Sequence, residues 1–272
     1  MTEAARCALA IGGLDPGGGA GIAADLRAFG AAGAFGCAAV ALVTVQSTAG
    51  LRGVKSLPPR EVAAQAAEVL GHQRVGAVKV GALGSEGNVR AVAALLARHP
   101  RVPVVVDTPM AATRARGQGA QARLLAMRAV SALREALLPR ATLVTANADE
   151  AEALVGQRVT TVGEAHDAAL ALVAAGARAA LVKGGHWGGA TAIDVLAVGS
   201  DVTELRAKRL PNGAHGTGCT LASLVAGRLA VRTGARVDAS TLIAAVRWSK
   251  RVHHAALSRA IDVGGPVRVL AF

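Results

Sequence analysis

The chain is poor in aromatic residues and in cysteine, and it has no long uninterrupted apolar run. Aromatic residues make up 2% of the 272 residues and tyrosine is absent, so the core must be built from Ala, Val and Leu. The apolar runs are too short to cross a bilayer, and the first residues lack the charged-then-apolar order of a signal peptide. Three cysteines without metal-ligand spacing fit a reducing compartment. We therefore expect a cytoplasmic protein with no membrane partner.

The scarcity of aromatics also bears on the net charge, which is +12. Such a charge fits nucleic-acid binding, attraction of a phosphorylated ligand, or simply an arginine-rich surface. Proteins that bind nucleic acid cluster their cations, and those that bind single strands stack bases on aromatic side chains. Here the 30 Lys and Arg residues are spread along the chain. We expect no specific nucleic acid as a partner, and a basic surface that attracts phosphates.

Short β-type runs alternate with helical stretches along most of the chain. The predicted strands are Ala8–Ile11, Ala38–Val45, Ala77–Val80, Val102–Val106, Leu143–Val144 and Ala179–Val182. The predicted helices are Ala23–Ala32, Pro59–Gly71, Gly87–Arg98, Ala120–Leu138, Ala148–Val155 and Val162–Ala175. This alternation predicts an α/β fold with a central, mostly parallel sheet and helices on both faces.

The pattern changes after Lys183. Gly199-Ser200-Asp201 separates the runs Ala192–Val198 and Val202–Ala207, which predicts a hairpin. Two helices, Thr217–Arg228 and Ser240–Ser258, close the chain. No linker, repeat or low-complexity block interrupts the sequence, so we predict a single domain over residues 1–272. A boundary near residues 117–119 is less economical, because it leaves two half-sheets.

The most informative segment is a glycine-punctuated turn, residues 212–220, that opens onto an apolar helix. Free N–H groups at a helix start, together with the positive end of its dipole, suit a phosphate or a developing anion. Gly216 and Gly218 let the backbone come close to that anion. The same dipole is expected to stabilise the thiolate of Cys219 as a base, although an inert buried thiol is the alternative. With Thr217 between the glycines, the turn predicts phosphoryl transfer.

Polar and glycine residues also collect where the predicted strands end, which is the edge at which such sheets bind ligands. They are Asp15–Gly21, Gln46–Thr48, Lys79–Gly81, Asp107, Asn147–Glu150 and Lys183–His186. Some of them have plain structural interpretations. Asn147 is a natural helix N-cap, Lys79 can pair with a carboxylate under the sheet, and His215 is more often a turn residue than a catalyst. His253, further along, reads as a helix-surface or interface residue.

Six motifs in this order carry a resemblance, although no single one is specific. They are GLDPGGGAGIAAD at 13–25, TVQST at 44–48, KVGAL at 79–83, TANADEA at 145–151, VKGGH at 182–186 and HGTGCT at 215–220. The set resembles the bacterial hydroxymethylpyrimidine/phosphomethylpyrimidine kinases of thiamine biosynthesis, which belong to the ribokinase-like superfamily. The resemblance implies a ribokinase-like fold, a homodimer, and ATP with Mg²⁺.

The implied activity is transfer of the γ-phosphoryl group of ATP to 4-amino-5-hydroxymethyl-2-methylpyrimidine, and then to its monophosphate. The resemblance implies pyrimidine binding by Gln46, Asp25, Gly13, Ala20 and Ala82. It implies catalytic roles for Cys219, Gly216, Thr217, Gly218 and Lys183. It implies nucleotide binding by Asn147, Glu150, Asp107, Lys183 and Gly218, with Glu150 and Asp107 near Mg²⁺. An amide such as that of Gln46 suits an aminopyrimidine because it both donates and accepts hydrogen bonds.

The chain departs from the family pattern after its mid-chain strand. Residues 107–117 read DTPMAATRARG, where the family has DPVMVAKSG, so a lysine and a serine are missing. We expect residues 113–117 to form a mobile flap over the substrate, in which Arg114 or Arg116 could replace that lysine. Ala82 stands where methionine is common and widens the pocket. Two alternatives stay open: a pyridoxal kinase of the same superfamily and a non-catalytic ligand-binding relative.

Overall fold

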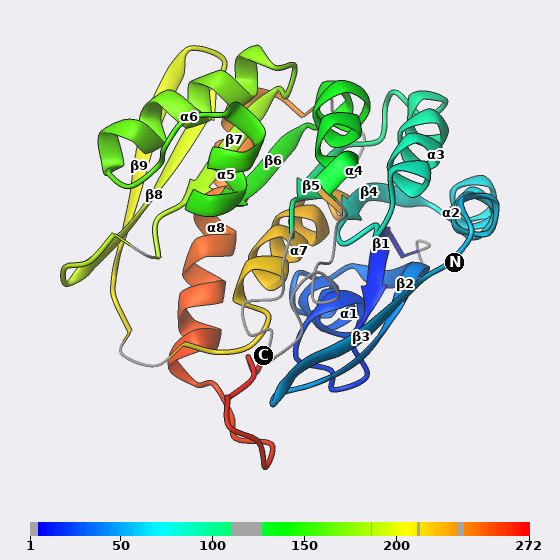
Figure 1. Cartoon of the computed structure of the whole chain (residues 1–272), viewed down its shortest axis with the longest axis horizontal. Coiled ribbons are helices and arrows are strands. Elements are labelled where there is room, and N and C mark those ends of the chain that lie inside the picture. The colour runs from blue at the N-terminus through cyan, green and yellow to red at the C-terminus, as the bar shows by residue number, and fades with distance from the viewer. Residues whose placement is uncertain (1–4, 110–126, 186, 211–212, 233–236) are drawn as a thin grey trace.

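A computed structural model describes residues 5–109, 127–185, 187–210, 213–232 and 237–272 (Figure 1). Its strands form one nine-stranded sheet in the order β3-β2-β1-β4-β5-β6-β7-β8-β9. Strands β1, β2 and β4 to β7 run parallel to one another, whereas β3, β8 and β9 pair antiparallel with their neighbours. The predicted α/β fold with a mostly parallel sheet is confirmed. The single continuous sheet supports the one-domain interpretation, which stays a prediction.

The bounds of the elements follow the predicted ones closely. The strands are β1 (Cys7–Leu14), β2 (Phe35–Ser47), β3 (Gly50–Ser56), β4 (Val75–Val80), β5 (Val104–Asp107), β6 (Leu143–Asn147), β7 (Ala179–Lys183), β8 (Thr191–Val198) and β9 (Asp201–Lys208). The helices are α1 (Gly21–Ala31), α2 (Pro59–His72), α3 (Glu86–Ala97), α4 (Met127–Ala132), α5 (Ala148–Val155), α6 (Val162–Ala174), α7 (Thr217–Ala230) and α8 (Ala239–Ser258).

Two apolar layers hold the sheet between its helices. Val104, Val105 and Val106 are fully buried because β5 is covered on both faces, which is why its sequence is apolar without alternation. Inward side chains of α2, α3, α5 and α6 pack with one face of the sheet. Those of α1, α7 and α8 pack with the other. Figure 1 shows α1 and α7 side by side, with α8 beyond α7.

Two parts of the fold differ from the prediction. Strand β3 was not predicted, because Gly50 and Gly53 interrupt a short polar run; it is an edge strand that pairs with β2 alone. The helix predicted over Ala120–Leu138 is a short α4, followed by a π-helical turn at Leu133–Leu137 and a 3₁₀ turn at Leu138–Arg140. Residues 120–126 of that prediction lie outside the described residues.

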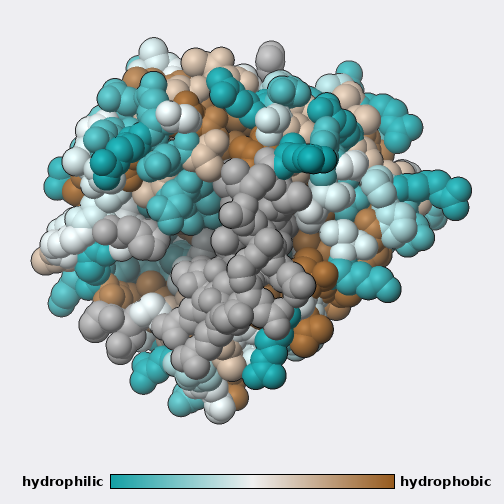
Figure 2. Space-filling model, viewed as in Figure 1, coloured by the Kyte–Doolittle hydropathy of each residue, from teal (hydrophilic) through white to brown (hydrophobic). Residues whose placement is uncertain are grey.

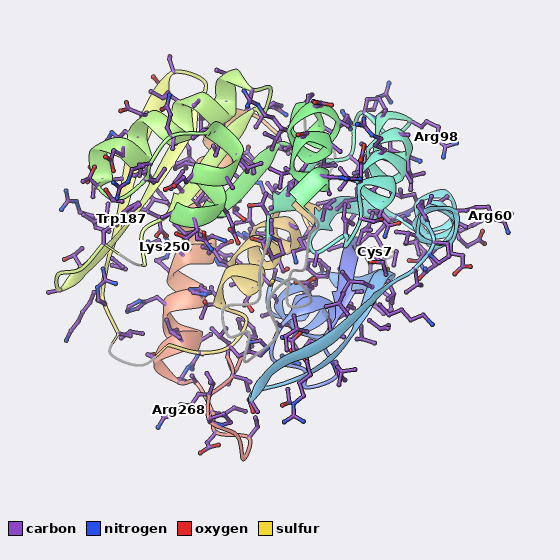
Figure 3. The ribbon with its side chains drawn as sticks, in the orientation of Figure 1. Cys7, Arg60, Arg98, Trp187, Lys250 and Arg268 are labelled. Carbon is purple, nitrogen blue, oxygen red and sulfur yellow. The ribbon has the colours of Figure 1, made fainter. Side chains whose placement is uncertain are left out.

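The charged side chains are distributed over the surface. Arg60 and Arg98 are exposed and point away from α2 and α3 (Figure 3). Hydrophilic residues are spread over the face shown in Figure 2, between smaller hydrophobic areas. No helix in the described ranges is both long enough and apolar enough to span a bilayer.

Candidate active site

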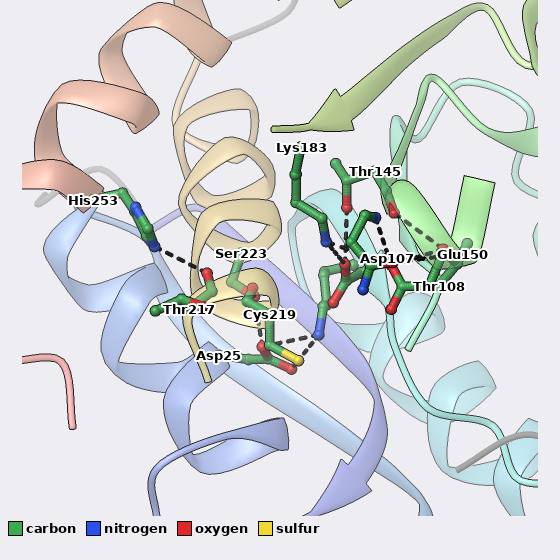
Figure 4. A network of polar contacts seen from close by, with 12 residues as sticks. Asp25, Asp107, Thr108, Thr145, Glu150, Lys183, Thr217, Cys219, Ser223 and His253 are labelled. Atoms are coloured by element: carbon green, nitrogen blue, oxygen red, sulfur yellow. Dashed lines mark hydrogen bonds and ion pairs between the residues drawn. The ribbon is translucent and has the colours of Figure 1, made fainter. Parts of the chain in front are cut away.

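The polar residues predicted at the strand ends meet at one edge of the sheet. Because β1, β4, β5, β6 and β7 are parallel and adjacent, their carboxyl ends lie next to one another. The turn at Gly216 brings the start of α7 to the same edge, where Figure 4 shows Cys219, Lys183 and Asp107 close together. The site has two ends, described in turn: a charged end around Lys183 and a hydrogen-bonded end around His215.

Lys183 is the centre of the charged end. Its Nζ lies 3.1 Å from Asp107 Oδ1 and 3.8 Å from Glu150 Oε2. Thr145 also donates to Asp107 Oδ1, at 2.9 Å. These groups come from the ends of β5, β6 and β7 and from α5, so the sheet itself sets their spacing. The predicted grouping of Lys183, Asp107 and Glu150 is confirmed as a spatial cluster.

The protonation states follow from this arrangement. Burial favours the neutral amine, but Asp107 and Glu150 outweigh it and raise the pKa of Lys183. Burial also opposes the charge of Asp107, yet Lys183 and Lys79 lower the pKa of that carboxyl below its usual value. Glu150 has a raised pKa, mainly because of its burial. The centre therefore holds a fixed ammonium beside one firmly ionised carboxylate.

Beneath this cluster lies a second, fully buried ion pair. Lys79 Nζ is 3.0 Å from both carboxylate oxygens of Asp25, and each side chain is 1% exposed. Ser223 Oγ on α7 donates to Asp25 Oδ1 at 2.6 Å and to the carbonyl of Cys219 at 2.9 Å. The pair thus joins β4, α1 and α7, and breaking such a buried pair costs about 3–5 kcal/mol. The predicted pairing of Lys79 is confirmed, whereas contact of Asp25 with the pyrimidine stays a prediction.

The start of α7 is open to an anion. Gly216 has φ +78°, and a Cβ there would collide with the carbonyl of Gly19, so only glycine fits this turn. Among the hydrogen bonds of the described residues, none takes the N–H of Thr217, Gly218 or Cys219. A Cβ built on Gly218 would lie 3.2 Å from Lys183 Nζ. The free amides and the ammonium therefore face the same space, as an anion site requires.

Cys219 differs from the expectation in its charge. Burial raises the pKa of its thiol to about 12, with the nearby Lys79 opposing that shift and Asp107 adding to it. The loss of hydration is the largest cause, and the carboxylates of Asp107 and Asp25 add to it, although the side chain is only half-buried by surface area. The expected stabilised thiolate is therefore wrong: the residue is a neutral thiol near pH 7. It nevertheless lies beside Lys183 and Asp107 at the carboxyl edge of the sheet (Figure 4).

Helix α8 supports both the anion turn and the segment after Lys183. His253 Nε2 donates to the carbonyl of Thr217 at 3.0 Å (Figure 4). Burial lowers the pKa of His253 to about 4, so the ring is neutral. One turn earlier, Lys250 pairs with Asp194, which also accepts the N–H of Gly184. Figure 3 shows Lys250 at α8. The interpretation of His253 as a surface residue is wrong, because its ring is used to hold the first turn of α7.

The hydrogen-bonded end joins three segments far apart in the sequence. His215 Nε2 lies 2.9 Å from Asp15 Oδ2 and 3.1 Å from Gln46 Nε2. Asp15 also accepts the N–H of Gly17 and of Ala20, each at 2.9 Å. Burial raises the pKa of Asp15, but these bonds, that of His215 foremost, outweigh it and lower the value overall. The sequence grouped Asp15 with the polar strand ends and indicated a turn residue at His215, but it assigned neither a role in binding or catalysis.

The remaining predicted pyrimidine residues lie nearby. A Cβ built on Gly13 would come within 3.6 Å of Ala82 Cβ, so these residues are neighbours. Ala82 lines a small cavity together with Gly81, Asp107 and Thr108. Ala20 is the residue before α1, and its N–H is bound by Asp15. The structure therefore brings Gly13, Ala20 and Ala82 together, and their contact with substrate stays a prediction.

Asn147 has the structural role that its position suggested. Its Oδ1 accepts the N–H of Glu150 at 2.8 Å, and Glu150 Oε2 accepts the N–H of Asn147 at 2.8 Å, which makes a reciprocal capping box for α5. This cap fixes the carboxylate of Glu150 close to Lys183. Contact of Asn147 with a nucleotide stays a prediction.

The carboxylates fit a phosphate-bound Mg²⁺ in their chemistry. Within the described ranges no group of three His, Cys, Asp or Glu side chains forms a ready-made metal cage. Mg²⁺ is commonly held by one or two carboxylates while phosphates and water complete its shell. Asp107 and Glu150, which share Lys183, offer that kind of donor set. The predicted flap at 113–117, with Arg114 and Arg116, and His186 lie outside the described residues.

The fold and the site together define a class of protein. The mostly parallel sheet places an anion-binding helix start, a lysine and two carboxylates at its ligand-binding edge. These groups are the ones that an α/β phosphotransferase uses. Comparison with known proteins narrows this class. The phosphomethylpyrimidine kinase family model matches residues 15–269, and the chain belongs to this family.

Relatives and solved structures agree with that assignment. The chain is 41% identical over 260 residues to the hydroxymethylpyrimidine/phosphomethylpyrimidine kinase of Streptomyces coelicolor, covering 95% of this chain and 91% of the relative. It superposes on the phosphomethylpyrimidine kinase of Clostridium difficile 630 with a TM-score of 0.76 at 28% identity, over 92% and 99% of the two chains. The ADP complex of Bacillus subtilis pyridoxal kinase gives 0.83 at 27% identity, over 98% and 97%. The predicted ribokinase-like fold is confirmed.

Proposed function

We propose that the protein transfers the γ-phosphoryl group of ATP to the hydroxymethyl oxygen of 4-amino-5-hydroxymethyl-2-methylpyrimidine, and then phosphorylates the monophosphate to the pyrophosphate, in thiamine biosynthesis. The observation that carries the proposal is the meeting of Lys183 with the free amides of Gly218 and its neighbours, beside Asp107. The family assignment and the named relatives support the pyrimidine as the substrate.

The chemistry follows from where the charges lie. Phosphoryl transfer passes through a loose transition state, so positioning and neutralisation of spread negative charge do most of the work. Lys183 and the amides at the start of α7 provide that neutralisation. Asp107 and Glu150 would hold Mg²⁺, which when bound neutralises charge on the phosphates. Cys219, as a neutral thiol, orients the hydroxymethyl oxygen by a hydrogen bond and takes up no proton. The hydroxyl proton leaves late, to an oxygen of the transferred phosphoryl group or to water.

The proposal is tested by mass spectrometry of the products formed from ATP, Mg²⁺ and the free pyrimidine. We expect the monophosphate first and the pyrophosphate on longer incubation, with no product after chelation of Mg²⁺ by EDTA. Monophosphate alone contradicts the second step. Nucleotide binding without any product contradicts catalysis and favours the non-catalytic relative.

Pyridoxal is the second candidate substrate, because the fold superposes closely on that of a pyridoxal kinase. The identity to pyrimidine kinases is higher, at 41%. Turnover of both compounds with ATP and Mg²⁺ separates the candidates. A kcat/KM that is higher for pyridoxal than for the pyrimidine overturns the first choice.

We also propose a cytoplasmic homodimer. Three free cysteines support a reducing compartment. Val43 and Val45 on β2 are 38% and 64% exposed, beside the edge strand β3, and burying such valines is a common use of a dimer interface. Light scattering of the purified protein tests this part: a mass near 54 kDa, twice the 27.1 kDa of the chain, is expected, and a mass near that of one chain contradicts it.

A further inference from the structure

The contacts of His215 have a consequence for substrate selection. Its Nε2 is the ring atom that meets two partners, Asp15 Oδ2 at 2.9 Å and Gln46 Nε2 at 3.1 Å. Asp15 already accepts two backbone N–H bonds, from Gly17 and Ala20, and its pKa is lowered, so it is an ionised carboxylate. An ionised carboxylate accepts hydrogen bonds and donates none. The Nε2 of His215 therefore carries a hydrogen, whether the ring is neutral or cationic, and donates it to Asp15.

The hydrogen on His215 Nε2 determines which atom of the Gln46 amide, oxygen or nitrogen, faces the His215 ring. Two N–H donors that face each other form no hydrogen bond. The amide orientation that places Gln46 Nε2 3.1 Å from His215 Nε2 is therefore unfavourable. A half-turn about the last side-chain torsion exchanges the amide oxygen and nitrogen without moving the rest of the residue. The oxygen then shares the one Nε2–H of His215 with Asp15 in a three-centre hydrogen bond, and the amide NH₂ group turns away from the ring.

The His215 ring is held firmly enough to impose this choice. A Cβ on Gly19 would collide with the ring at Cδ2, so the Gly19 backbone packs against it. The backbone N–H of His215 donates to the carbonyl of Arg268 at 2.8 Å, and Val269 pairs with His215 as an isolated bridge. The ring is thus clamped between the loop after β1 and the C-terminal segment.

We infer that Asp15 and His215 form a positioning pair that fixes the sense of the Gln46 amide, with its oxygen beside His215 and its NH₂ group toward a ring nitrogen of the substrate. The amide oxygen keeps a second lone pair for an exocyclic amino group. The site then selects a ring that carries an amino donor next to a nitrogen acceptor. This inference rests on the proposed function and names the substrate edge that is read.

Calorimetric binding without ATP tests the pair, using the aminopyrimidine and its analogue that lacks the 4-amino group. One hydrogen bond of this kind is worth about 1–3 kcal/mol when its partner is left unpaired, which corresponds to a preference of roughly 5- to 150-fold. We expect the wild-type protein to show a preference in this range and His215→Phe to reduce it below about threefold. His215→Gln returns an N–H donor and is expected to recover part of it.

His166→Phe is the matched control, because it removes a histidine that pairs with Glu204 at 3.1 Å, away from the site, and it should keep the wild-type preference. Kinetics with ATP give a second readout: in His215→Phe the KM for the aminopyrimidine should rise more than kcat falls. If His215→Phe does not fold, Asp15→Asn replaces it, because an amide in place of the carboxylate no longer requires a hydrogen on His215 Nε2, and the preference should again fall.

An unchanged preference in a folded variant overturns the positioning pair alone. Wild-type protein that binds and discriminates the two compounds but makes no phosphorylated product overturns the proposed function alone. Wild-type protein that binds neither compound overturns both.

Discussion

The two ends of the site are built in different ways. The charged end consists of buried ion pairs on strand ends and on α1, where Lys183, Asp107, Lys79 and Asp25 are each 15% exposed or less. The hydrogen-bonded end consists of loop residues and a half-buried histidine, and it draws on segments up to 200 residues apart. Buried charges of fixed spacing suit stabilisation of the transition state. Amide and imidazole groups held in one sense suit discrimination between substrates. We therefore expect the charged end to determine the rate of phosphoryl transfer and the hydrogen-bonded end to determine which substrate is bound.

Substitution of Lys183 should break the charged end most severely. In Lys183→Met, kcat is expected to fall about 1,000-fold, because a cation that neutralises the transferring phosphoryl group is lost. The KM for the pyrimidine should change far less, since Lys183 pairs with Asp107 and Glu150, whereas His215 is bonded to Asp15 and Gln46. Steady-state kinetics of Lys183→Met beside Lys55→Met, an exposed lysine on β3, provide the measurement. A raised KM with an intact kcat contradicts the division between the two ends.

The neutral His253 should make the charged end sensitive to acid. The unfolded ring takes up a proton near pH 6.5, whereas the folded ring does so only near pH 4. Between these values the unfolded state binds more protons, so stability falls as the pH is lowered from 6.5 to 4. The loss is up to roughly 3 kcal/mol for a shift of this size.

Urea unfolding at pH 7 and at pH 4.5 checks this prediction. The variant His253→Gln keeps a donor for the carbonyl of Thr217 without the titration, so its stability should change less between the two pH values. His72→Gln, which alters an exposed histidine on α2, is the control and should behave as the wild type. Equal changes in wild type and His253→Gln show that the ring already titrates normally in the fold.

Loss of the thiol should have the smallest effect. In Cys219→Ser we expect kcat to fall by about tenfold or less, because a base adds little to a loose transition state. Burial raises the pKa of Cys219 to about 12, so no thiolate builds up in the neutral range. The pH–rate profiles of the wild type and of Cys219→Ser should therefore have the same shape from pH 7 to 9. A 1,000-fold loss, or a limb near pH 8 that only the wild type shows, makes the thiolate essential after all.

The sequence predicted the charged end better than the hydrogen-bonded end, for a physical reason. Apolar runs locate β5, β6 and β7, and a parallel sheet then brings Asp107, Asn147 and Lys183 together without further information. The capping box of α5 was readable too, since Asn147 and Glu150 have the required spacing. The pairing of His215 with Asp15 depends on how two loops pack, and no periodicity records that.

Two other misses have related causes. Strand β3 is defined by its partner β2 and not by its own composition, which includes two glycines. The charge of Cys219 depends on burial and on four neighbouring ionisable side chains from α1, β4, β5 and β7, whereas the helix start alone was visible in the sequence. Local sequence signals thus predicted where the site residues lie better than they predicted the protonation state of Cys219.

The contact between Gly19 and Gly216 sets a dimension of the molecule. The loop that holds Asp15 and the turn that starts α7 touch through their backbones. This contact sets the distance between the residues around His215 and the anion site at Gly218. Making room for a substrate that has already gained one phosphate by widening that distance would require these two backbones to part. The added phosphate has to be met by a shift or tilt of the small molecule, so the spacing between two glycines governs how the second transfer can begin.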